Sequence, residues 1–185
     1  MRLLHAWTVG SVGNAGIGRA YKFFAHSVGR WPWKPLIVKS FVIPKHMFAL
    51  WLFAHNKFLT RDRLGFVTDK SCALCNADVE SFAHLYFRCN VSSRIWAGVR
   101  EWLLMKKIMG ASTAVLRAFR GTYRGNSTLN KIRCVALVAT VYYVWNDRNR
   151  TIFESEKPEV EGIIKRIKIL RFRCIPSDIA VVDGF

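Results

Sequence analysis

Acidic residues are scarce in this chain of 185 residues, which has 12 Asp and Glu against 29 Lys and Arg and a formal net charge of +17. The first acidic residue is Asp62, and none lies between Glu101 and Asp147. A chain this basic must tolerate its own repulsion, and a polyanionic partner such as a nucleic acid is the usual reason. A solvated basic surface with no specific partner is the alternative.

Paired carboxylates are also missing. The acids Asp62, Asp69, Asp78 and Asp147 stand singly, and no Tyr/Phe-x-Asp-Asp string or carboxylate cluster is present to hold catalytic Mg²⁺. The scattered glycines near the N-terminus do not have the spacing of a nucleotide-binding turn. We therefore expect neither enzymatic activity nor a small-molecule substrate.

Long hydrophobic runs are missing too. The longest, residues 134–145, has twelve residues, fewer than the ~20 that span a bilayer. The N-terminus lacks a sustained apolar stretch, so we expect neither a signal peptide nor a membrane partner. Of the five cysteines, Cys134 and Cys174 are expected to be reduced thiols, which fits a nuclear or cytoplasmic protein.

The chain does carry a C-x2-C-x8-H-x4-C pattern, formed by Cys72, Cys75, His84 and Cys89. Two thiols separated by two residues can reach one metal ion from a tight turn, and an imidazole and a third thiol complete the tetrahedron that Zn²⁺ prefers. Because protein groups fill all four positions, the pattern predicts one structural Zn²⁺ and no catalytic metal. A chance C-x-x-C beside an unrelated His and Cys is the alternative.

The spacing inside this pattern sets a geometric condition. Helix-starting residues precede His84, which we expect in the first turns of a short helix. Cys89 follows five residues later, about 140° away from the face of the histidine on an α-helix. The helix must therefore end or distort before Cys89 if both side chains are to bind one ion.

Apolar periodicity predicts a mainly α fold, in which a small zinc knuckle is inserted into a helical domain, because no convincing period-2 strands occur. We expect helices over residues 17–28, 44–57, a short segment after Thr60, 91–107, 128–153 and 159–173. The expected organisation is an N-terminal loop and short helix at 1–35, a zinc-binding domain at 36–107, a linker at 108–127 and a C-terminal helical segment at 128–185.

The residues around the metal pattern resemble a known family. The chain has the motifs of that family in the same order. The matching residues are Pro44-Lys45, the aromatic-rich stretch Phe48 to Phe53, Leu59-Thr60, Arg63-Leu64, Cys72, Cys75, Glu80, His84 to Phe87, Cys89 and Trp96. This stretch is similar to the zinc-binding domain of plant reverse transcriptases from non-LTR (LINE-type) retrotransposons, with Tyr86 in place of a family Phe. Tyr142–Phe153 resembles a helix that often follows this domain. The resemblance covers about 20–153 and implies a domain detached from its polymerase.

Charge and resemblance together predict a non-catalytic zinc-binding module that binds RNA or single-stranded DNA. The candidate nucleic-acid contacts are Lys70, Arg88, Arg94, Arg148 and Arg150. We expect Glu80 to cap the short helix rather than to reach the zinc shell. The alternatives are a zinc-stapled protein-interaction or scaffold fragment, with a reverse transcriptase or another protein as its partner, and a degenerate element product without selected activity.

Overall fold

The computed structural model describes residues 42–105, 110–121 and 127–175. The helices in these ranges are α4 (Pro44–Ala54), the 3-10 turn η1 (Arg61–Arg63), the π-helical turn η2 (His84–Arg88), α5 (Asn90–Trp102), α6 (Ser112–Gly121), α7 (Thr128–Phe153) and α8 (Val160–Cys174). These described ranges hold no strand, only an isolated bridge, which confirms the predicted mainly α fold. The helix expected at 17–28 and the segment 1–35 lie outside them.

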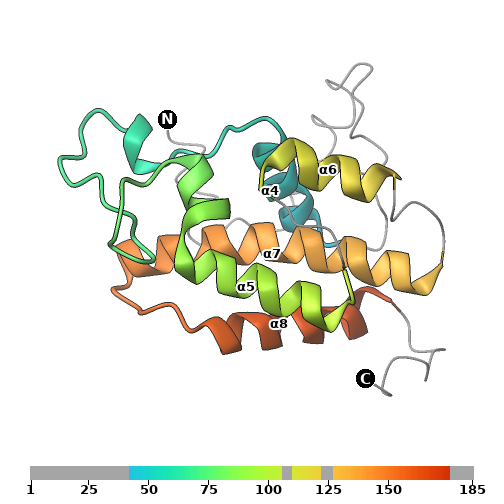
Figure 1. The fold of residues 1–185 in the computed structure, drawn as a ribbon. Helices are drawn as coiled ribbons and strands as arrows, with labels where there is room; N and C mark the ends of the chain where they lie inside the picture. Colours follow the sequence, from blue (N-terminus) through green and yellow to red (C-terminus); the bar gives the residue numbers. More distant parts are fainter. Residues whose placement is uncertain (1–41, 106–109, 122–126, 176–185) are drawn as a thin grey trace.

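Helix α7 is the centre of the fold (Figure 1), with α4 packed on one side and α5 and α8 on the other. Its side chains from Ile132 to Val144 are apolar around most of the circumference, and a helix of that kind is stable only when it is buried. Ser127 caps it by accepting the amide hydrogen of Asn130 at 3.3 Å. The helix predicted at 128–153 is thereby confirmed. Within the described ranges, no helix is both long enough and apolar enough to cross a bilayer.

Helices α5 and α8 run side by side in the same direction. Arg94 pairs with Glu161 at 3.1 Å near the start of α8. One turn further along, a Cβ on Gly98 would lie 2.5 Å from Ile164 Cδ1, so glycine allows the two helices to approach closely. The core-facing stripe of α8 consists of the buried residues Val160, Ile163, Ile167 and Leu170, with Ile164 half-buried beside it, as the periodicity predicted.

Helix α6 occupies part of the segment that the sequence predicted to be a linker. Val115 and Leu116 on α6 are buried, and the helix packs against α4. The expectation of a linker at 108–127 is therefore wrong for Ser112–Gly121. The apolar residues of the segment do gather on one helical face, so the pattern was present in the sequence, but its short length and the glycines at positions 110, 121 and 125 favoured the linker interpretation.

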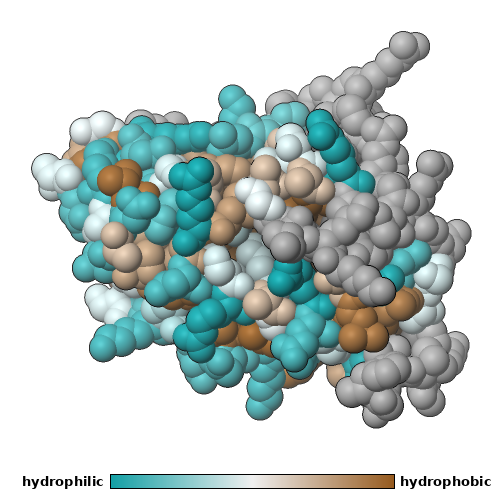
Figure 2. Space-filling view, in the orientation of Figure 1, coloured by the Kyte–Doolittle hydropathy of each residue, from teal (hydrophilic) through white to brown (hydrophobic). Residues whose placement is uncertain are grey.

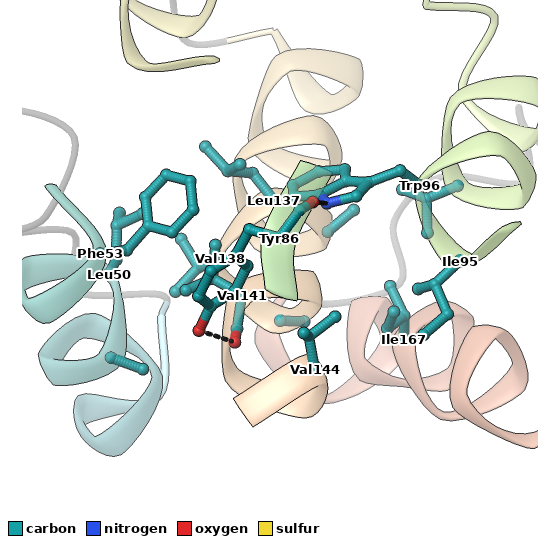
Figure 3. Close-up of a cluster of buried hydrophobic side chains, with 14 of the residues drawn as sticks. Leu50, Phe53, Tyr86, Ile95, Trp96, Leu137, Val138, Val141, Val144 and Ile167 are labelled. Carbon is teal, nitrogen blue, oxygen red and sulfur yellow. Dashed lines mark hydrogen bonds between the residues drawn. The ribbon is translucent and has the colours of Figure 1, made fainter. Parts of the chain in front are cut away.

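An aromatic cluster joins the metal pattern to α7. Tyr86, on η2, is fully buried, and its ring lies 4.9 Å from that of Phe53. Its hydroxyl donates to the Val141 carbonyl on α7 at 3.3 Å, and the Trp96 indole donates to the Tyr86 carbonyl at 3.0 Å (Figure 3). Burial raises the pKa of Tyr86 well above its usual value, so the hydroxyl remains a donor.

Candidate metal centre

The first two thiols lie on a tight turn that is closed by a bridge between Ser71 and Val79. The Cys72 amide donates to the Asp78 carbonyl at 2.8 Å, and the Asn76 amide donates to the Cys72 carbonyl at 2.8 Å. Asn76 has a φ of 54°, a left-handed conformation that asparagine tolerates better than most residues. Local backbone bonding therefore presents the C-x-x-C thiols from one turn before any metal contributes.

His84 follows a cap that the sequence assigned to a different residue. Ser81 Oγ accepts the His84 amide hydrogen at 3.1 Å and caps the helical segment that begins at Phe82. The expectation that Glu80 caps this helix is wrong, because the Glu80 carboxylate is turned to other partners, described below. The His84 side chain is buried, so capping at Ser81 places the imidazole toward the interior.

The turn between His84 and Cys89 meets the geometric condition set by their spacing. Residues His84–Arg88 form a π-helical turn, in which the Cys89 amide donates to the His84 carbonyl at 2.8 Å. This i→i+5 bond places residue 89 over residue 84, a register that an α-helix cannot give. Cys89 is then extended and begins α5. The predicted distortion before Cys89 is confirmed, and π-bulges of this kind are frequent at functional sites.

The four side chains predicted as ligands converge. Their ligand atoms all lie within 4.8 Å of one another, with 3.9 Å between the Sγ atoms of Cys72 and Cys89 and 3.2 Å between Cys75 Sγ and His84 Nε2. A tetrahedral Zn²⁺ with bonds of ~2.3 Å to sulfur and ~2.0 Å to nitrogen sets its ligands about 3.5–3.8 Å apart. The residues present therefore fit one Zn²⁺. Three are buried and Cys75 is half-buried, so the four protein ligands close the site.

The Cys72 and Cys89 thiols share their protons unevenly. The hydrogen bond from the Cys72 thiol, assisted by the amides of Ser92 and Val91 at the start of α5, lowers the pKa of Cys89 to about 5, although burial opposes the shift. The same hydrogen bond, followed by burial, raises the pKa of Cys72. Zinc binds thiolates, so the remaining thiol protons leave when the ion binds. The chemistry of the donor set is that of a structural zinc site.

A carboxylate lies beside the ring nitrogen of His84 that faces away from Cys75. Asp78 Oδ2 lies 3.4 Å from His84 Nδ1, on the opposite side of the ring from the nitrogen that faces Cys75. Nδ1 is buried and forms no hydrogen bond with the described residues, so Asp78 acts on it through charge, and a carboxylate beside the second ring nitrogen orients a ligating imidazole. Replacing Asp78 by Asn is expected to weaken zinc affinity about tenfold, the low end of the range for such partners, because Asp78 is solvent-exposed. Competition with a chromophoric chelator measures this, and Glu101→Gln, an exposed acid on α5, provides the control for loss of one charge. Equal affinities of the two variants would contradict the assignment.

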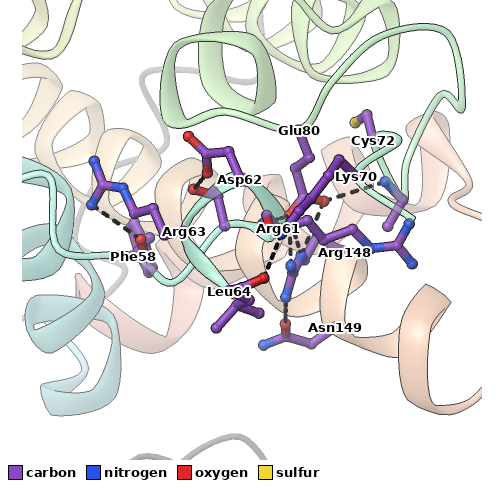
Figure 4. A network of polar contacts seen from close by, with 12 residues as sticks. Phe58, Arg61, Asp62, Arg63, Leu64, Lys70, Cys72, Glu80, Arg148 and Asn149 are labelled. Carbon is purple, nitrogen blue, oxygen red and sulfur yellow. Dashed lines mark hydrogen bonds and ion pairs between the residues drawn. The ribbon is translucent and has the colours of Figure 1, made fainter. Parts of the chain in front are cut away.

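Glu80 is fully buried and ties the metal turn to the body of the protein (Figure 4). Its carboxylate accepts the amide hydrogens of Arg61 at 2.9 Å and of Ala73, inside the C-x-x-C turn, at 3.2 Å. It also pairs with the Arg148 guanidinium of α7 through contacts of 2.5 to 3.1 Å. One carboxylate thus joins η1, the metal turn and α7, which nothing in the local sequence indicates.

Arg148 does not serve the role predicted from sequence. Its side chain is 4% exposed, is held by Glu80 and by Asn149 Oδ1 at 2.9 Å, and lies 4.8 Å from the centroid of the Trp145 ring. A guanidinium buried in this way cannot reach a phosphate, so the predicted nucleic-acid contact at Arg148 is corrected to a structural one.

Most of the other predicted nucleic-acid contacts are engaged inside the chain. Lys70 Nζ donates to the backbone carbonyls of Arg61 and Leu64. Arg94 pairs with Glu161, and Arg150 pairs with Asp147 one turn earlier on α7 and with two acids that follow the helix, Glu154 and Glu156. Arg88 is exposed and has no polar partner among the described residues. The sequence identified cations near the metal pattern but could not tell which of them are already paired.

Comparison with known proteins agrees with the metal geometry. The family model described as zinc-binding in reverse transcriptase matches residues 17–96, which include the four converging side chains and extend to Trp96 on α5. No curated protein and no solved structure matches the chain. The resemblance to reverse-transcriptase zinc-binding domains is confirmed for the matched residues, and α6, α7 and α8 lie outside the match.

Proposed function

We propose that this chain is a zinc-stabilised, non-catalytic module that binds RNA or single-stranded DNA and derives from the reverse transcriptase of a plant LINE-type retrotransposon. The closed Cys3His centre, inside a stretch that matches zinc-binding in reverse transcriptase, is the observation that carries the proposal. A metal with four protein ligands supplies shape and stability rather than chemistry. The function must then come from the surface of the folded chain rather than from the metal.

The charge of that surface supports a polyanionic ligand. Each internal ion pair, such as Glu80 with Arg148 or Asp147 with Arg166, consumes one acid and one cation. Internal pairing therefore leaves the excess of +17 unchanged. Phosphate contacts with release of counterions are the physical route by which such a surface binds nucleic acid. A nuclear or cytoplasmic location, where such ligands occur, follows from this proposal.

A salt series tests the proposal. The zinc-loaded chain is titrated into fluorescently labelled single-stranded RNA, single-stranded DNA and duplex DNA between 50 and 200 mM salt, a range over which six to ten phosphate contacts change the affinity by about 10³–10⁵-fold. We expect micromolar or tighter binding to the single strands, a steep loss with salt, and weaker binding after chelation of zinc. Absence of binding at low salt would reject the nucleic-acid function.

A protein-interaction module is the second candidate, because the loops around the metal turn expose large apolar side chains. Phe66 is 76% exposed and Val79 is 53% exposed. Exposed apolar groups at the rim of a rigid turn are typical of a surface that docks on another protein, and a reverse transcriptase is one partner of this kind. Self-association of the zinc-loaded chain in sedimentation, together with no response in the salt series, would favour this second function.

A further inference from the structure

We propose that the outward face of α8, formed by Lys165, Lys168, Ile169, Phe172 and Arg173 and called here the α8 face, is the surface that binds single-stranded nucleic acid. The inference rests on the proposed function and assigns its site. It places the ligand on a helix outside the matched residues 17–96, away from the metal turn, where Lys70 and Arg148 are engaged internally.

The α8 face is one continuous stripe. Its members are three or four residues apart along the helix, so their side chains are neighbours on the same side. All five are exposed, while the opposite side of α8 is buried against α5 and α7. Beyond Glu161, which pairs with Arg94, α8 contains no acid. Figure 2 shows hydrophilic residues along the lower edge of the molecule, where α8 lies in Figure 1.

Contacts with other described residues do not explain why three cations lie on the α8 face. Lys165 and Arg173 form no ion pair with any residue that the structure describes, and Lys168 contacts only the Trp102 ring, at 5.9 Å. Lys165 and Lys168 lie three residues apart, a spacing at which like charges repel on a helix. The helix dipole favours Arg173 in the last turn but not Lys165 in the middle of the helix. A polyanion laid along the face would neutralise all three.

The apolar members of the face indicate which polyanion. Phe172 is 59% exposed and Ile169 is 44% exposed, between the three cations. The Arg171 guanidinium lies 4.3 Å from the centroid of the Phe172 ring, which steadies the ring at the surface. An exposed aromatic ring beside cations is a stacking platform for unpaired bases, whereas a duplex hides its base faces. Residues 165 to 173 extend about 12 Å, the length of three to four stacked nucleotides.

Matched triple variants test the assignment, with a fluorescein-labelled uridine 12-mer as the probe in anisotropy titrations across salt. Lys165→Gln, Lys168→Gln and Arg173→Gln together remove three cations and keep helix propensity. The control combines Lys45→Gln, Lys57→Gln and Arg117→Gln, which remove the same charge from exposed positions on and near α4 and α6, across α7 from α8 (Figure 1). On single strands each phosphate contact contributes roughly 0.7 to the slope of log affinity against log salt concentration. The α8 variant should therefore reduce the steepness of this slope by about 2, and the control should leave it unchanged.

Phe172→Leu gives an independent readout. It keeps apolar bulk and removes the ring, so we expect affinity to fall about tenfold without a change in salt slope. If the wild type binds and the two triple variants lose the same affinity and the same salt slope, the assignment of the site to the α8 face is wrong, while the proposed function stands. Absence of wild-type binding would overturn both. If polyglutamate binds as tightly as the RNA, and binds the Phe172→Leu variant equally well, the ligand would be an acidic protein and not a nucleic acid.

Discussion

Replacing His84 by Ala or Cys75 by Ser is expected to abolish zinc binding and unfold residues 70–90. Binding of a structural Zn²⁺ contributes about 10–16 kcal/mol, and a domain of this size is stable by only about 5–15 kcal/mol in total. The other anchors of the segment are the Ser71–Val79 bridge, the Glu80 carboxylate and the buried Tyr86 ring, and we expect them to be insufficient once the binding energy of the ion is lost. Metal content should fall from one ion per chain to none, and amide exchange across 70–90 should lose its protection.

The helical body should respond to the loss of zinc only in part. Helix α7 keeps direct contacts with α4 and with α8 that do not pass through the metal turn. Far-ultraviolet dichroism should therefore decrease without collapsing. Cys134→Ala is the matched control, since Cys134 is a buried thiol on α7 outside the cluster, and this variant should retain its zinc. Unchanged amide exchange across 70–90 after chelation would mean that the cysteines and histidine converge without binding a metal.

Glu80→Gln is expected to destabilise the zinc-loaded protein by roughly 3–5 kcal/mol, because it leaves the Arg148 guanidinium buried without a counter-charge. The Arg61 and Ala73 amides donate to different oxygens of the carboxylate, so the single amide oxygen of Gln can keep only one of these bonds, and the loss includes one backbone hydrogen bond besides the ion pair. Urea unfolding in saturating zinc measures the effect. Glu156→Gln is the control: Glu156 pairs with Arg150 at the surface, and loss of an exposed pair costs about 0–1 kcal/mol.

The double variant Glu80→Gln with Arg148→Met separates a charge effect from a packing effect. Removing both charges should restore much of the stability lost in Glu80→Gln, since replacement of a buried ion pair by neutral groups is often close to neutral. Additive losses would mean that the two side chains act through separate contacts. Equal stabilities of Glu80→Gln and Glu156→Gln would contradict the buried bridge itself.

The elements predicted well from sequence are those whose information is local. Helix α7 was predicted with its observed bounds because a long apolar run specifies it, and the structure adds the cap at Ser127. The π-turn could be anticipated only as a requirement, from the five residues between His84 and Cys89, and the structure supplied its form. Helix α6 was missed because it is only 10 residues long and lies among glycines, although Val115 and Leu116 share its buried face.

By itself the sequence determined the zinc-type ligand set, the excess of positive charge and the helical class, because residue identity and short spacing carry all three. Only the tertiary structure decided which charges remain available to a ligand. Glu80 and Arg148 are 68 residues apart in the chain, yet they form one buried pair that removes a predicted phosphate contact. Lys165 and Arg173 keep their charge at the surface. Charge pairing depends on distance in space and on exclusion of water, and neither is encoded in the separation of two residues along the chain.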